Sequence, residues 1–209
     1  MSLRTGIEQG SDQWQRARLG IVTGSKLGKC FTTKLAISKA GCDTLGRDLA
    51  CEYMHRKNNT IPEFYENSHM IRGSFMEAEA VRALAFQYDD MTCIPGGFYL
   101  DADKHLGASP DAIFAKDGIE IMGGEVKCPK IENHLKYLID GGVPPLYYPQ
   151  VQHSMLVTGL DKWVFCSYYP GANLHKFEQE RDDEFFEKIN EVVEIVITKA
   201  KKYAKVLGV

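Results

Sequence analysis

The 209-residue sequence predicts a mixed α/β fold, in which a mixed sheet is flanked by helices. Helical signals dominate residues 1–90, short strand-like runs bounded by turn residues fill 91–180, and a long helical pattern covers 181–209. A chain of this length can bury one sizeable core. We therefore expect a single domain over residues 1–209, with the sheet as its core and a helical elaboration on its N-terminal side.

Caps and apolar residues spaced about four apart predict the N-terminal elements. A short helix is expected after Ser11 and Asp12, and Gly20 stops it. Thr23 can cap a second helix, which runs through Cys30. Two further helices are expected over 41–57 and 68–88, with a polar loop over 58–67 between them.

Strands and further helices are expected in the second half of the chain. Three strands, over 98–100, 112–114 and 119–126, would form an antiparallel meander with a turn at Lys116-Asp117-Gly118. The remaining expected elements are helices over 131–140 and 147–158, strands over 163–168 and 174–180, and a final helix capped by Asp182.

Composition excludes several classes of protein. Hydrophobic residues make up 44% and charged residues 25%, as in ordinary globular proteins. No apolar run reaches the roughly 18 residues of a membrane span, and residues 1–6 lack the apolar core of a signal peptide, so we expect neither a membrane protein nor export. The six cysteines form no C-x-x-C pair, which argues against a structural zinc or iron–sulfur site.

The charge is unevenly distributed along the chain. The formal net charge is −3, but residues 1–60 hold ten Lys and Arg against five Asp and Glu. A basic N-terminal third could hold phosphates, while the acidic remainder could supply metal ligands. The alternative is an ordinary solvated surface.

Asp111 and the run Glu125-Val126-Lys127 are the most informative motif. In a strand, residues two apart point to the same face, so Glu125 and Lys127 would share one face while Val126 packs on the other. Paired carboxylates can hold a divalent metal, and a nearby lysine can orient a water or balance the charge of a phosphate. The alternative for Glu-x-Lys alone is a solvated charge pair on an exposed strand.

Six motifs in order make the sequence resemble the phage lambda-type exonucleases, the alkaline exonuclease or YqaJ-like viral recombinase branch of the restriction-endonuclease-like PD-(D/E)XK superfamily. The motifs span nearly the whole chain: residues 8–14, residues 18–25, Arg72-Gly73 with Glu77, Ser109-Pro110-Asp111, residues 125–129 and residues 150–155. The resemblance implies a restriction-endonuclease-like core.

The resemblance also implies a metal site. Asp111, Glu125 and the Val126 carbonyl would be shared ligands of Mg²⁺, with Mn²⁺ as a possible substitute and two ions per site. Asp101, ten residues before Asp111, looks like the ligand of the second metal, although Asp103 is a close alternative. Octahedral oxygen coordination and in-line displacement between two ions suit such ligands.

Further roles follow from the resemblance. Lys127 would hold the attacking water, Glu77 would be an additional carboxylate at the site, and Gln150 would bond a water or phosphate. The alternatives are a solvated Glu77 and a Gln150 that packs between helices. The side chains expected to bind a terminal 5′ phosphate are Arg18, Ser25 and Ser109. Taken alone, Trp14 is more typical of a core residue than of a surface on which bases stack.

The implied activity is that of a Mg²⁺-dependent 5′→3′ exonuclease. It would degrade one strand of double-stranded DNA from its ends and leave 3′ overhangs for phage-type recombination. The resemblance further implies a ring-shaped homotrimer, a single-strand annealing protein as partner, and the cytoplasm of a bacterial host as location. Two alternatives are a DNA endonuclease on the same metal site and a non-catalytic protein that binds DNA ends.

Overall fold

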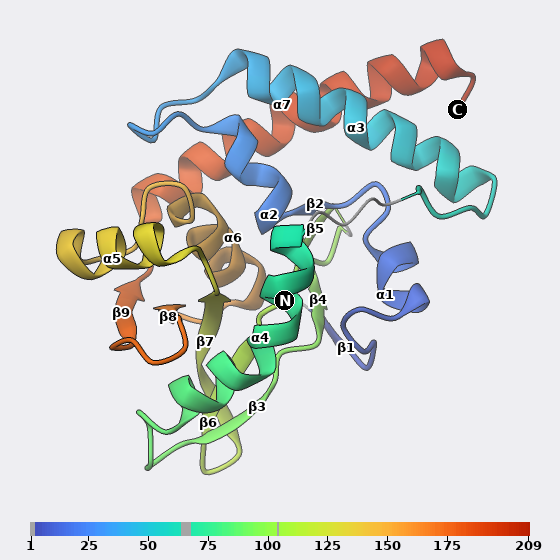
Figure 1. The fold of residues 1–209 in the computed structure, drawn as a ribbon. Coiled ribbons are helices and arrows are strands. Elements are labelled where there is room, and N and C mark those ends of the chain that lie inside the picture. Colours follow the sequence, from blue (N-terminus) through green and yellow to red (C-terminus); the bar gives the residue numbers. More distant parts are fainter. Residues whose placement is uncertain (1–2, 64–67, 104) are drawn as a thin grey trace.

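Two sheets flanked by helices make up the structure, a computed structural model, so the predicted mixed α/β class is confirmed (Figure 1). The structure describes three ranges of the chain: residues 3–63, 68–103 and 105–209. Within these ranges, no helix is both long and apolar enough to cross a membrane.

The larger sheet has five strands in the order β3-β6-β7-β8-β9. They are β3 (Thr92–Pro95), β6 (Ala112–Lys116), β7 (Ile119–Lys127), β8 (Lys162–Ser167) and β9 (His175–Glu180). β7 and β8 run parallel, and the other pairs are antiparallel. The predicted turn between β6 and β7 is confirmed, because Asp117 and Gly118 both have positive φ, as a tight hairpin turn requires.

The smaller sheet has four strands in the order β1-β4-β5-β2. They are β1 (Leu3–Thr5), β4 (Phe98–Leu100), β5 (Leu106–Ala108) and β2 (Val22–Thr23). The predicted three-strand meander is therefore wrong: β4 pairs with β1 and β5, and not with β6. The reason is that β5 intervenes, and Pro110, which has no N–H to donate, separates β5 from β6.

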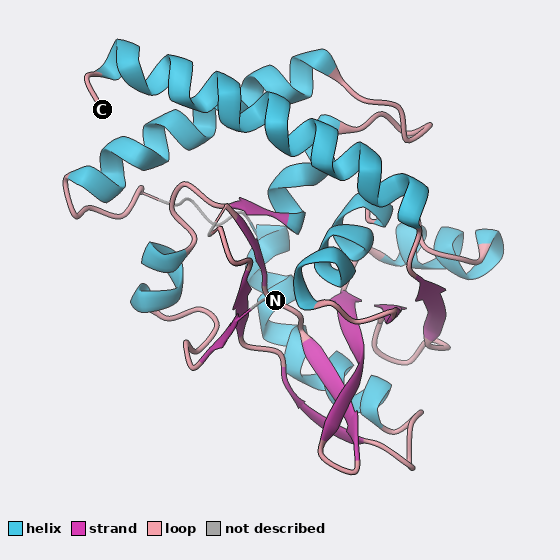
Figure 2. Cartoon of the chain, turned by 180° about the vertical axis from the view of Figure 1, so that it is seen from behind, coloured by secondary structure: helices cyan, strands magenta, loops and turns pink. Residues whose placement is uncertain are grey.

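Helices surround the sheets, as Figure 2 shows from behind. They are α1 (Asp12–Ala17), α2 (Gly24–Leu27), the 3₁₀ turn η1 (Gly28–Cys30), α3 (Lys39–Lys57), α4 (Ser68–Ala85), α5 (Ile131–Asp140), α6 (Tyr148–Thr158) and α7 (Asp183–Leu207). Each predicted helix is present. Of the loop predicted over 58–67, residues 58–63 contain no helix or strand, and 64–67 lie outside the described residues.

The caps explain where several helices begin and end. Ser11 and Asp182 accept hydrogen bonds from the backbone three residues on, and Gly159 ends α6 in the left-handed conformation. Thr23 precedes α2, but its side chain makes no capping bond, and this helix is only four residues long before it tightens into η1.

Alternating residues of β8 divide the core into two layers. Trp163 and Phe165 pack with α3, α6 and α7, whereas Val164 and Cys166 pack with α4. Helices α3 and α7 lie side by side above the sheets in Figure 1, where Gly46 allows close approach to Lys199. Each fully buried apolar side chain stabilises the fold by about 2 kcal/mol. The site residues are held between these layers.

Candidate active site

β7 carries Glu125 and Lys127 on the face opposite Val126. Val126 packs in the layer with α4, so its neighbours point the other way, toward α6. Glu125 is only 1% exposed, and Lys127 Nζ donates a hydrogen bond to Glu125 Oε1. The structure therefore brings these two charged groups together as the alternation of a strand predicts.

Asp111 joins this pair from the segment before β6. Its backbone N–H donates to the carbonyl of Gly124 at 3.0 Å, and its Oδ2 accepts from the backbone N–H of Val126 at 2.7 Å. Main chain and side chain thus both tie Asp111 to β7. The predicted pair of carboxylates is held at the C-terminal end of one strand.

The protonation of the three groups reflects their burial together. Burial raises the pKa of Glu125 to about 7, although Lys127 opposes the shift. The pKa of Asp111 is also raised, first by burial, with Lys127 again opposing. Burial lowers the pKa of Lys127, but the charges of Glu125 and Asp111 outweigh it and raise that pKa above its usual range. Lys127 is therefore a cation at neutral pH.

The two oxygens of Glu125 are unequally satisfied. Oε1 accepts from Lys127 and from Gln150 Nε2, the latter at 2.5 Å. Oε2 is buried and has no hydrogen-bond partner among the residues that the structure describes. An unsatisfied buried acceptor costs about 1–3 kcal/mol, so this atom favours a bound cation.

These residues fit a divalent metal. The oxygens available are those of the carboxylates Asp111 and Glu125 and the carbonyl of Val126, which suit Mg²⁺ when waters complete the shell. Among the described residues, no group of three or more His, Cys, Asp and Glu side chains is arranged to hold a metal ion. The fit therefore rests on the pair and on the unsatisfied Oε2 of Glu125.

Glu77, on α4, belongs to the same electrostatic cluster. Burial raises its pKa to about 7, the charge of Asp111 adds to the shift, and Lys127 opposes it. Arg72, on the same helix, donates to the carbonyl of Pro129 at 3.0 Å and so ties α4 to the end of β7. Glu77 is half-buried rather than freely solvated.

Asp101, expected as the ligand of the second metal, follows β4 directly. Its Oδ1 accepts from the backbone N–H groups of His105, at 2.7 Å, and Leu106, at 3.0 Å, so it holds the turn between β4 and β5. Asp103 lies in the same turn. The role of either carboxylate as a metal ligand stays a prediction.

Arg18, Ser25 and Ser109 form a second cluster, with Trp14 between them. Arg18 lies over the Trp14 ring, 3.9 Å from its centroid, and donates to Ser25 Oγ at 3.3 Å. Trp14 Nε1 donates to Ser109 Oγ at 2.8 Å. The three residues predicted to bind a phosphate are thus linked, and Trp14, expected in the core, instead connects them.

Two observations bring this cluster close to the carboxylates. Burial lowers the pKa of Arg18 to about 10, and the charges of Glu52 and Glu125 oppose that shift, so Arg18 stays cationic at neutral pH. Gly24 packs on Gln150, since a Cβ there would lie 2.9 Å from Gln150 Cγ. Ser25 follows Gly24 directly, and Gln150 bonds Glu125.

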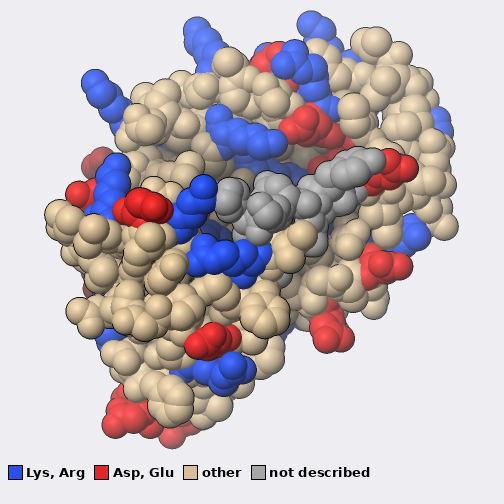
Figure 3. All heavy atoms as spheres, in the orientation of Figure 1, with Lys and Arg blue, Asp and Glu red and all other residues tan. Residues whose placement is uncertain are grey.

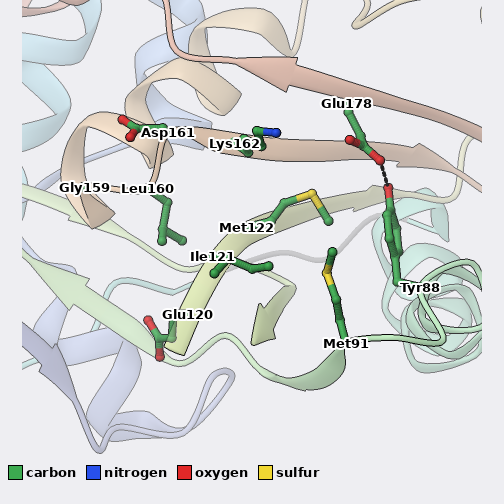
Figure 4. A pocket seen from close by; sticks show the side chains of 10 residues that line it. All are labelled: Tyr88, Met91, Glu120, Ile121, Met122, Gly159, Leu160, Asp161, Lys162 and Glu178. Carbon is green, nitrogen blue, oxygen red and sulfur yellow. Dashed lines mark hydrogen bonds between the residues drawn. The ribbon is translucent and has the colours of Figure 1, made fainter. Parts of the chain in front are cut away.

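A hollow lies at the other end of β7. Its volume is about 450 Å³, and Figure 4 shows Tyr88 and Glu178 joined across it by a 2.8 Å hydrogen bond. Met91, Met122 and Leu160 supply apolar surface. None of the predicted site residues lines this hollow.

The family model described as YqaJ-like viral recombinase domain matches residues 13–161, well over half of the chain. The chain belongs to the YqaJ-like viral recombinase family. The match contains both clusters, from Trp14 and Arg18 to Gln150. No curated protein matches the chain significantly.

Solved structures share the fold. An alkaline exonuclease from Laribacter hongkongensis is 25% identical, with a TM-score of 0.79 over 95% of this chain and 96% of that one. The same exonuclease in complex with dAMP gives 24% identity and a TM-score of 0.78, over 94% and 96%. A phage-related exonuclease from Haemophilus somnus is 14% identical, with a TM-score of 0.62 over 90% and 96%, and supports the fold alone.

Proposed function

We propose that this protein is a metal-dependent 5′→3′ exonuclease that degrades one strand of linear double-stranded DNA from its ends. Family membership and the likeness to an alkaline exonuclease support a DNA exonuclease. The observation that carries the proposal is the buried, unsatisfied Oε2 of Glu125 beside Asp111 and Lys127. The 3′ overhangs would serve phage-type recombination in the host cytoplasm.

Asp111, Glu125 and the Val126 carbonyl would hold Mg²⁺, with Mn²⁺ as a substitute. When bound, the metal would supply Lewis-acid activation of water and stabilise charge on the leaving oxygen. Asp101, whose Oδ1 accepts from the turn between β4 and β5, or its alternative Asp103 would be a ligand of the second ion.

The chain's own residues orient the reactants. Lys127, cationic at neutral pH, would balance the charge of the scissile phosphate or hold the attacking water. Gln150 fixes Glu125 through Oε1 and leaves Oε2 free for the ion. Arg18, with the hydroxyls of Ser25 and Ser109, would bind the terminal 5′ phosphate, because a guanidinium binds phosphate bidentately.

Surface features agree with DNA and protein partners. Lys and Arg side chains gather near the centre of the face in Figure 3, where phosphates could bind. Helix α5 exposes Ile131, Leu135, Leu138 and Ile139, an apolar surface typical of protein contacts. A homotrimeric ring and a single-strand annealing partner are part of this proposal through the resemblance to lambda-type exonucleases.

Digestion of end-labelled linear duplex tests the proposal. We expect Mg²⁺-dependent release of mononucleotides from 5′ ends, blocked by EDTA, and no attack on closed circular DNA. Cleavage of circles as fast as linear duplex would establish an endonuclease instead. End binding without digestion, unchanged by Asp111→Ala, would indicate a non-catalytic protein.

A further inference from the structure

Lys26 and Glu52 form a largely buried ion pair between α2 and α3, which sequence reasoning missed. Lys26 Nζ lies 2.6 Å from Glu52 Oε2, and the side chains are only 20% and 17% exposed. Burial lowers the pKa of Lys26, and Glu52 opposes that shift. The two residues are 26 positions apart, so no local pattern in the sequence joins them.

Every further bond of the pair goes to the segment that carries Arg18. Lys26 Nζ donates to the carbonyls of Arg18, at 3.2 Å, and Ile21, at 3.1 Å. Glu52 Oε2 accepts from the backbone N–H of Gly20 at 2.8 Å. A lysine has three donors, and all three of Lys26 have acceptors within the protein. Lys26 therefore has no donor left for a substrate.

The segment 18–21 makes a bend that needs such support. Gly20 has φ +71°, and a Cβ there would lie 2.5 Å from the ring of Tyr53 on α3. The bend is pressed against α3 while Arg18, at its start, turns toward Trp14 and Ser25. A small shift of this bend would move the guanidinium relative to Ser25.

A contribution to stability does not by itself explain why the Lys26–Glu52 pair is present. A buried ion pair gains little net stability, because the desolvation of both charges offsets their attraction. The neighbouring pair Lys29–Asp48 joins η1 to the same helix α3 at the surface, at 3.1 Å. Among the described residues, Lys29 has no side-chain hydrogen bond to segment 18–21, whereas Asp48 acts on Lys26 through its charge. What distinguishes Lys26–Glu52 is its set of bonds to the Arg18 segment.

We propose that Lys26 and Glu52 are positioning residues that hold the main chain of segment 18–21, so that Arg18 faces Ser25 and selects a 5′-phosphorylated end. This inference rests on the proposed function. It predicts that the pair controls the preference between 5′-phosphate and 5′-hydroxyl ends, and not the rate of the chemical step.

The test compares digestion of linear duplexes that differ only in a 5′ phosphate or a 5′ hydroxyl. Lys26→Met and Glu52→Gln should each reduce the rate preference for the phosphate by about tenfold, as loss of a supporting contact does. The loss should lie in KM for the phosphorylated end, with kcat kept. The matched control Lys29→Met should keep the wild-type preference.

A charge swap, Lys26→Glu with Glu52→Lys, separates positioning from ion pairing. The swap restores opposite charges and should recover thermal stability. The carboxylate that it introduces at position 26 cannot donate to the carbonyls of Arg18 and Ile21, so the preference should stay low. Recovery of the preference by the swap would overturn the inference. So would a wild-type preference in folded Lys26→Met.

If a single variant fails to fold, the double variant Lys26→Met with Glu52→Met leaves no unpaired buried charge and takes its place. Its preference should again be reduced, and an unreduced preference would overturn the inference. A failure of the proposed function gives a different result. The wild-type protein would then digest 5′-phosphate and 5′-hydroxyl ends at the same rate, and Arg18→Met would leave that unchanged.

Discussion

The two ends of β7 both carry acidic side chains, but within the described residues only the C-terminal end has a buried carboxylate oxygen without a hydrogen-bond partner. At the N-terminal end, Glu120 accepts from Arg4 and, at 2.8 Å, from the hydroxyl of Tyr99. Glu178, on β9 and across the hollow from Glu120, accepts from Tyr88. At the C-terminal end, Oε2 of Glu125 is buried with no partner.

The hollow near Glu120 therefore does not identify the reactive end. Glu120, in β7, bonds Arg4 of β1 and Tyr99 of β4, so it joins the two sheets. The carboxylates of Glu120, Asp161 and Glu178, which line the hollow, all have partners. The end with Glu125 holds two carboxylates with raised pKa values and an acceptor that a cation would satisfy. Unmet electrostatic interactions, more than volume, mark the candidate site.

Matched substitutions at the two ends give the largest expected difference. Glu125→Gln should lower nuclease activity by at least about 100-fold, since loss of a ligand should exceed the loss of a supporting residue. Glu120→Gln, five residues earlier on the same strand, should stay within about twofold, because an exposed ion pair contributes little. Both variants are assayed on linear duplex with Mg²⁺. Equal losses would contradict the contrast between the ends.

Gln150 and Gln152 test the same contrast on α6. Gln150→Ala removes a donor to Glu125 Oε1 and should lower activity about 10–100-fold. Gln152 instead donates to the carbonyl of Glu180 and accepts from the N–H of Asp182. Gln152→Ala should lower the free energy of unfolding by about 1–3 kcal/mol while the folded enzyme keeps its activity. Urea unfolding and digestion assays of both variants measure this; an active Gln150→Ala protein would remove Gln150 from the site.

Metal activation should depend on pH through Glu125. Its pKa is raised from 4.5 to about 7, so below pH 7 a proton occupies the group that must bind the ion. Apparent Mg²⁺ affinity should rise up to about tenfold per pH unit from pH 6 toward 7 and then level off. The half-activating Mg²⁺ concentration at pH 6, 7 and 8 measures this. Glu120→Gln should follow the same curve, and a flat curve between pH 6 and 7 would exclude the raised pKa.

Sequence was most informative where the determinants are local. The bounds of α5, residues 131–140, were predicted because a glycine pair and a proline pair end the pattern. Glu125 and Lys127 share a face because strand alternation dictates it. The short strands β1, β2, β3 and β5 were missed, because two to four residues are too few to show a period.

Contacts between distant segments could not be predicted. Asp101 has the spacing of the family pattern, but only the structure shows that its carboxylate bonds to the turn that follows it. The pair Lys26–Glu52 leaves no local trace. Trp14 reads as a core residue from its apolar ring, yet its N–H donates to Ser109, which follows it by 95 positions.

The smallest expected effect belongs to the satisfied end of β7. Tyr88→Phe removes the hydroxyl that donates to Glu178 at 2.8 Å, while the ring can keep its packing against Phe114. Glu178 is exposed, so water can replace the lost donor, and the free energy of unfolding should fall by only about 1 kcal/mol. Nuclease activity and its Mg²⁺ dependence should not change. Thermal unfolding and digestion together check this: a loss of activity without a loss of stability would give the hollow a role in catalysis and end the contrast between the two ends.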